Sequence, residues 1–161
     1  MQRQPSHNRA FTLIELLIVL AIMGLLAGLT LPVAELTVQR SREQDLRLAM
    51  REMRLAIDAY KKAYDEGRIP RVVGSSGYPA NLAVLVEGVE DATDLNRKKI
   101  YFLRRIVRDP MNPDSSITAA DSWGKRSYDS EADKPRVGTD VYDVYSRSTK
   151  LGLNGVSYDE W

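Results

Sequence analysis

The chain has 161 residues, which suits one modest domain plus an additional segment. Its 23 lysine and arginine residues nearly balance 22 aspartate and glutamate residues, so the net charge of +1 provides no global field for attracting nucleic acid or acidic partners. There is no cysteine, and the single histidine, His7, precedes a long apolar segment. If the residues before that segment are removed, the remainder lacks the side chains needed for thiol chemistry, Ser-His nucleophile pairs and most zinc sites.

The first predicted element is an apolar helix over Phe11–Leu31, a stretch of 21 residues whose single charge is Glu15. A helix of that length is about 30 Å long, which is enough to cross the hydrocarbon core of a membrane. Arg3 and Arg9 precede it, and positive residues stay on the cytoplasmic side. The pattern therefore predicts a single-pass membrane anchor, with a cytoplasmic N-terminus before processing and a translocated C-terminal domain.

Three interpretations of this segment compete: a cleaved secretory signal, a plain signal anchor, and a signal that is cut before the apolar run, so that the run stays in the mature chain. A secretory signal has an apolar region of about 7–15 residues followed by small residues at the cut, and this run is longer. Placing a carboxylate within a bilayer costs roughly 3 kcal/mol, and a plain anchor gains nothing that offsets this cost. Cleavage before Phe11 would create an ammonium four residues ahead of Glu15, and in a bundle of such helices it could pair with the Glu15 carboxylate of a neighbouring copy. The pair would then fix the register between subunits.

The sequence Arg-Ala-Phe-Thr-Leu-Ile-Glu at residues 9–15 resembles the cleavage and methylation motif of type IV pilins and type II secretion pseudopilins. The resemblance implies that a membrane aspartyl peptidase cuts between Ala10 and Phe11 and methylates the new amino group, leaving an N-methylphenylalanine, and that Glu15 is the assembly residue. Ala10 departs from the glycine that this family usually has before the cut.

Further along the apolar helix, Gly24 and Gly28 form a small-xxx-small pair that permits close helix packing, although glycine is common in membrane helices without such a role. Pro32 removes a helical hydrogen bond and predicts a bend. By resemblance, the stretch from Gly24 to Pro32 loses helical order during assembly.

The pattern from Val33 to Asp65 predicts that the helix continues as an amphipathic half, ended by Gly67 and Pro70. Its apolar positions recur at helical spacing and are expected to face a core: Leu46, Met50, Met53, Ile57, Tyr60 and Tyr64. Three arginines lie along one side, at positions 47, 51 and 54. They are expected to form ion pairs, Glu43 with Arg47 and Arg54 with Asp58, rather than to bind nucleic acid, because no aromatic side chains alternate with them.

The remaining residues predict a small domain. A short helix is expected over 78–87, a charged loop over 96–99, an extended half-buried segment over 101–106 and a short strand near 126–128. Alternation over 141–146 predicts a strand with Asp143 facing solvent. Asp109 and Asp140 are likewise expected to be turn or solvent-facing residues without a catalytic role. Trp161 is expected to anchor the C-terminal tail.

This half is similar to the major pseudopilin of type II secretion systems in several short motifs: Tyr78-Pro79 with Asn81-Leu82, Leu103–Ile106 with Asp109-Pro110, Trp123-Gly124 with Arg126-Ser127, and Asp143–Ser146. The resemblance implies an α+β, pilin-like fold, in which a long N-terminal helix packs on a small antiparallel sheet with a short second helix. It also implies a calcium site in the loop after the last strand. That loop has Lys150 about where the family places its first acid and offers only Asn154 and Asp159 as candidate ligands, so the residues predict no cofactor or metal, with the loop held by Leu151, Leu153 and Trp161.

The predicted organisation is a cleaved basic leader over residues 1–10, a transmembrane and assembly half-helix over 11–32, and a globular domain over 33–161. The resemblance implies that the anchor lies in a bacterial inner membrane and the globular domain in the periplasm. The predicted function is structural rather than enzymatic: a subunit of a periplasmic pseudopilus that drives protein export. The resemblance implies a helical homo-oligomer as the filament, together with minor pseudopilins, the prepilin peptidase and an inner-membrane assembly platform as partners. Two alternatives remain open, a type IV or competence pilin for adhesion, motility or DNA uptake, and a membrane-tethered binding domain or enzyme.

Overall fold

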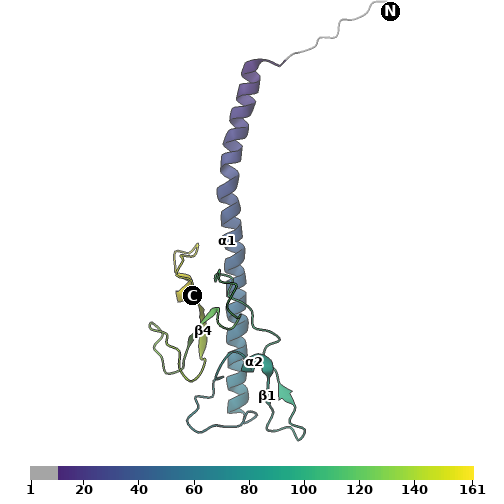
Figure 1. Ribbon diagram of the computed structural model, residues 1–161, viewed down its shortest axis with the longest axis vertical. Coiled ribbons are helices and arrows are strands. Elements are labelled where there is room, and N and C mark those ends of the chain that lie inside the picture. Colours follow the sequence, from purple (N-terminus) through teal and green to yellow (C-terminus); the bar gives the residue numbers. More distant parts are fainter. Residues whose placement is uncertain (1–10) are drawn as a thin grey trace, which may run out of the picture. The chain divides into compact units, whose positions relative to one another are not determined.

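A computed structural model describes the backbone of residues 11–161, and the side-chain surroundings of residues 11–27 and 35–161. Contacts divide the chain into two compact units, Met1–Gln39 and Arg40–Trp161. The helix α1 (Leu13–Asp65) contributes to both units. The remaining elements belong to the second unit (Figure 1): α2 (Val84–Glu87), β1 (Val89–Glu90), β2 (Lys99–Ile100), β3 (Trp123–Arg126), β4 (Asp143–Ser146) and the 3-10 turn η1 (Tyr158–Glu160).

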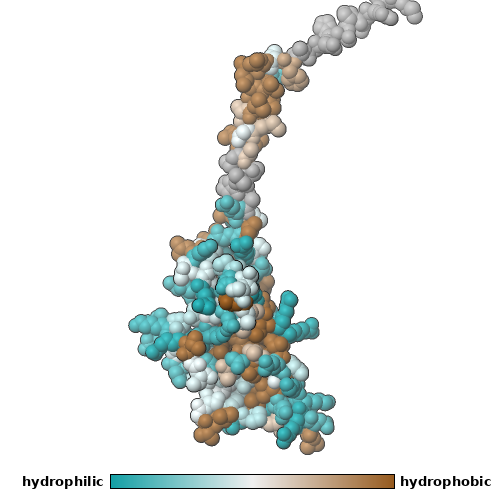
Figure 2. All heavy atoms as spheres, viewed as in Figure 1, coloured by the Kyte–Doolittle hydropathy of each residue, from teal (hydrophilic) through white to brown (hydrophobic). Residues whose placement is uncertain are grey.

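In the first unit, α1 carries an exposed apolar surface. Every described side chain from Phe11 to Ala27 is exposed, and Figure 2 shows apolar residues covering this segment. Exposed large apolar side chains that form a continuous surface are typical of a site that contacts lipid or another protein. Within the described residues, no helix is both long and apolar enough to cross a membrane.

In the second unit, α1 buries the predicted apolar stripe. Leu46, Met53 and Ile57 are fully buried, Met50 is 3 % exposed, and the stripe packs with side chains from α2, β3, β4 and η1. The helix ends as predicted at Gly67, whose φ of 75° is left-handed and whose N–H bonds the Tyr64 carbonyl at 3.0 Å. The predicted stripe is thus confirmed from Leu46 to Tyr60, which packs against the core, whereas Tyr64 is half-buried and does not belong to the core.

The β structure consists of two separate antiparallel pairs, β1 with β2 and β3 with β4. Trp123 lies opposite Ser146 and Arg126 opposite Asp143 in the second pair. Trp123 is 2 % exposed and donates its indole N–H to the Val107 carbonyl at 2.7 Å, so this pair closes over the core. Together with α1 and the short α2, these pairs confirm the α+β, pilin-like fold class.

Several element boundaries differ from the prediction. The second helix is limited to Val84–Glu87, because Asn81 accepts the Val84 N–H at 3.1 Å with its side chain and starts the helix there. The strand expected near 126–128 lies at Trp123–Arg126, where the register opposite β4 places it. The segment 101–106, expected to be extended and half-buried, mixes exposed and buried positions. The N–H groups of Phe102 and Leu103 both donate to the Leu85 carbonyl, at 3.0 and 2.9 Å, which ties this segment to α2.

Candidate assembly site

The start of α1 places Glu15 in the first helical turn. The Glu15 N–H donates to the hydroxyl of Thr12 at 3.3 Å, and the Leu16 N–H donates to the Thr12 carbonyl at 3.2 Å. Thr12 therefore acts as the N-cap, and an acidic residue three positions later completes the sequence pattern of a capping box. A negative charge in the first turn is also favoured by the helix dipole. This local role of Thr12 was missed in the sequence interpretation, although the spacing Thr-x-x-Glu signals it.

The other predicted residues of the N-terminal site lie along the same segment. Phe11 is 80 % exposed, and Glu15 is exposed as well. At Gly24 an added Cβ would meet nothing within 4 Å, so that face of the helix is open to a partner. Ala10 lies outside the described residues, and so do the side-chain surroundings of Gly28 and Pro32; cleavage after Ala10, helix packing and the bend stay predictions.

The C-terminal loop holds the two candidate metal ligands in local turns. The side-chain oxygen of Asn154 accepts the Val156 N–H at 3.1 Å, and Asp159 accepts the hydroxyl of Ser157. Across the described residues, no three His, Cys, Asp or Glu side chains gather as a metal site. Asn154 and Asp159 each accept a hydrogen bond from within the loop through one side-chain oxygen.

A buried acid of α1 holds this loop, which the sequence interpretation missed. Glu43 is 4 % exposed and accepts the Leu153 N–H at 2.7 Å and the hydroxyl of Tyr158 at 2.9 Å. The predicted pair with Arg47 is present, with 3.9 Å between the charged atoms. The expectation that Leu151 and Leu153 pack the loop is wrong, because their side chains are 65 % and 42 % exposed.

The predicted tail anchor is present. The ring of Trp161 stacks edge-on against Tyr158 at 5.1 Å, and the Arg47 guanidinium lies over it at 4.5 Å. Helix α1 thus holds the end of the chain through the acid Glu43 and the cation Arg47, while the rings of Tyr158 and Trp161 pack on each other.

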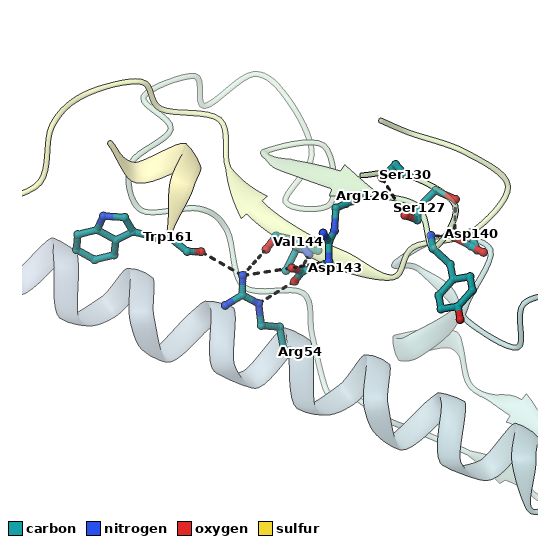
Figure 3. A network of polar contacts seen from close by, with 9 residues as sticks. Arg54, Arg126, Ser127, Ser130, Asp140, Asp143, Val144 and Trp161 are labelled. Carbon is teal, nitrogen blue, oxygen red and sulfur yellow. Dashed lines mark hydrogen bonds and ion pairs between the residues drawn. The ribbon is translucent and has the colours of Figure 1, made fainter. Parts of the chain in front are cut away.

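A second polar network joins α1 to β4 and the C-terminus (Figure 3). Arg54 donates to Asp143 at 2.7 Å and to the carbonyls of Val144 and Trp161 at 3.3 and 3.1 Å. Arg126 lies 3.9 Å from the other oxygen of Asp143. Two predictions are therefore wrong, the ion pair between Arg54 and Asp58 and the solvent-facing position of Asp143. Strand β4 directs Asp143 toward α1, where its carboxylate pairs with Arg54.

Asp109, expected to face solvent, is instead a fully buried acceptor. It takes the Met111 N–H and the hydroxyl of Ser146, both at 2.8 Å, and its own N–H donates to Ser122 at 3.0 Å. The carboxylate therefore stabilises the domain by joining the turn after residue 108 to β4.

Asp140 is also buried rather than solvent-facing, at 6 % exposure. Burial alone would raise the pKa of Asp140, but hydrogen bonds from Ser76, the Tyr128 N–H and Ser127 outweigh it and hold the pKa below its ordinary value. Asp109 and Asp140 can be buried because backbone N–H and hydroxyl groups donate the hydrogen bonds that water would otherwise supply to the two carboxylates.

The comparisons with known proteins add one finding. Residues 5–31 match the family model described as "Prokaryotic N-terminal methylation motif". Neither the curated proteins nor the solved structures yield a significant match. The match includes the Ala10–Phe11 bond and Glu15, and it concerns the N-terminal segment alone.

The motif and the fold together support one class of protein. A prepilin-type methylation motif, leading into a long helix with a small α+β domain, supports a type IV pilin-like protein. Proteins with this motif are structural subunits, substrates of a prepilin peptidase, and assemble into filaments; their N-termini are anchored in a membrane.

Proposed function

We propose that the chain is a structural subunit of a type II secretion pseudopilus, a short periplasmic filament that drives folded proteins out of the cell. The observation that carries the proposal is the methylation motif over residues 5–31, in which Glu15 is the single charge of an exposed apolar helix. In this proposal, residues 1–10 are removed, residues 11–32 form the transmembrane and assembly half of α1, and residues 33–161 form the periplasmic domain. Minor pseudopilins and an inner-membrane assembly platform are the expected partners.

Glu15 and Phe11 have complementary roles in assembly. Cleavage exposes the Phe11 amine, and its methylated cation pairs with the Glu15 carboxylate of an adjoining copy as a subunit leaves the lipid. Charges that are costly alone in a membrane become tolerable when they are paired. The pair would therefore promote entry of a subunit into the filament and fix its register there, and it would not affect folding of the second unit.

The test is a Glu15→Ala variant of the full chain in the native host. It is expected to be processed and to accumulate in the membrane, but to give at least tenfold fewer filaments than wild type. Glu131→Ala, which removes an exposed acid of the second unit, is the matched control and is expected to assemble normally. Normal filament yield from Glu15→Ala would refute the proposed role of this carboxylate.

The choice between pseudopilus and pilus depends on the second unit and on its similarity to the major pseudopilin. Its motifs occupy structural positions here, such as Trp123 on β3 and Asp109 in the buried turn. Deleting the chain from its host is expected to trap exported proteins in the periplasm while surface fibres persist. Loss of a long surface fibre, or of DNA uptake, with export intact would favour the pilin alternatives; an uncleaved, monomeric chain would favour a tethered domain.

A further inference from the structure

In the second unit, the face of α1 that points away from the core carries an exposed apolar ridge. Leu48 and Leu55 are 63 % and 62 % exposed, and they lie seven residues apart, which is about two helical turns. The opposite stripe of the same helix is buried, so this ridge is not needed to close the domain. Exposed leucines repeated along one helix face are typical of a surface that contacts another helix or domain.

Charges of opposite sign flank the ridge. Asp45 and Glu52 are exposed on one side, and Arg47 and Arg51 are exposed on the other. Arg51 and Glu52 are neighbours in sequence, but one residue turns a helix by about 100°, which places them on opposite sides of Leu48. Each flank borders a groove, one lined by Asp45, Leu48 and Glu52 and the other by Arg47, Arg51 and Leu55.

Arg47 is already paired with Glu43, but the other three flanking charges remain available to a partner. Among the described residues, Asp45, Arg51 and Glu52 take part in no ion pair. Arg54 and Arg108, which line the two grooves deeper in, are already engaged, Arg54 by Asp143 and Arg108 by the Ile117 carbonyl at 2.9 Å.

We infer that this face of α1 is a subunit–subunit interface whose occupant is a second copy of the same chain, with the Arg51 flank of one copy against the Glu52 flank of the next. The inference rests on the proposed function and names the surface through which the globular units meet. The two flanks differ, so the contact is heterologous: each copy offers one flank forward and the other backward. Such contacts continue into an open helical filament when the rotation does not close a ring. The ridge leucines exclude water, and the charge pairs set orientation.

The test uses charge reversal in the full chain, expressed in the native host, with filament yield as the measurement. Arg51→Glu and Glu52→Arg each juxtapose like charges and are expected to lower filament yield at least tenfold. The double variant R51E/E52R restores opposite signs and is expected to recover at least a third of the wild-type yield. Arg104→Glu reverses an exposed charge elsewhere in the second unit and is expected to leave the yield unchanged. Unchanged tryptophan emission, to which Trp123 and Trp161 both contribute, is the check on folding in every variant.

The outcomes separate failure of the proposed interface from failure of the proposed filament function. Wild-type yields from the two single variants would overturn the inference while leaving the proposed filament function intact. Low filament yields from both single variants without recovery in the double variant would also overturn it. Residues 51 and 52 would then affect assembly without pairing with each other across the interface. A wild-type chain that forms no filaments at all would overturn both this inference and the proposed function.

Discussion

Removing the Arg54 side-chain charge is expected to loosen the attachment of β4 and the C-terminus to α1. In Arg54→Met the apolar stem is kept, while the bond to Asp143 at 2.7 Å and the bonds to two carbonyls are lost. A hydrogen bond between charged groups contributes about 1.5–3 kcal/mol and a neutral one about 1. The Arg54 side chain is 41 % exposed, so solvent screening lowers the sum, and Asp143 keeps Arg126 nearby and the Val144 N–H at 2.8 Å.

The expected loss is therefore about 2 kcal/mol of unfolding free energy, which corresponds to a shift of roughly 1 M in the urea midpoint for a domain of this size. Urea unfolding of the full chain in detergent measures it through tryptophan fluorescence, because both tryptophans, Trp123 and Trp161, lie in the second unit. Arg105→Met removes an exposed arginine and is the control, with an expected change within about 0.5 kcal/mol.

A double-mutant cycle with Asp143→Asn separates the pair from its surroundings. The effects of Arg54→Met and Asp143→Asn are expected to fall short of additivity by about 1 kcal/mol, since the two groups share one interaction. Strict additivity, or a loss below 0.5 kcal/mol for Arg54→Met alone, would refute the conclusion that this network holds β4 to the helix.

Three further predictions concern the same unit. Asp109→Ala leaves the Ser146 hydroxyl and the Met111 N–H without a buried acceptor and is expected to cost about 3 kcal/mol in urea unfolding; a neutral result would contradict the assigned role. Hydrogen bonds from Thr93 and the ion pair with Arg68 lower the pKa of Asp91 from 3.8 to about 2, so this acid stabilises the fold fully above about pH 4 and loses that contribution as the pH falls toward 2. The stability difference between wild type and Asp91→Asn should shrink over that window, and a constant difference would refute the assignment. In Gly124→Ala the new Cβ would overlap the Tyr145 ring, so the variant is expected to lose about 2 kcal/mol of unfolding free energy, and full stability would show that the ring moves freely.

Sequence patterns predicted the features of this chain that depend on near neighbours. The buried stripe through Leu46 and Ile57 follows from spacings of three and four residues, and the helix end at Gly67 follows from the freedom of glycine at positive φ. The family match over residues 5–31 is of the same kind, since the methylation motif is contiguous.

The misjudged residues depend on partners far along the chain. Arg54 pairs across 89 positions with Asp143, and Glu43 accepts a hydrogen bond from Leu153 across 110. The sequence predicted an ion pair between Arg54 and Asp58, because residues four positions apart on a helix lie within reach of each other. The fold brings the Asp143 carboxylate together with two backbone oxygens, those of Val144 and Trp161, as acceptors for the same guanidinium. That geometry is set only when β4 pairs with β3.

The buried acids were misjudged for a related reason. An aspartate next to proline, as at Asp109, commonly marks an exposed turn, and nothing local indicates that Ser122 and Ser146 will surround it. Polar residues become buried where the tertiary structure supplies donors, which periodicity does not reveal.

Mass spectrometry of the mature N-terminus, on protein purified from its own cells, tests the central claim most directly. The account predicts a chain that begins at an N-methylated Phe11, because assembly needs the amine that cleavage exposes beside Glu15. A mature protein that still begins at Met1, or that begins within the apolar helix, would contradict it.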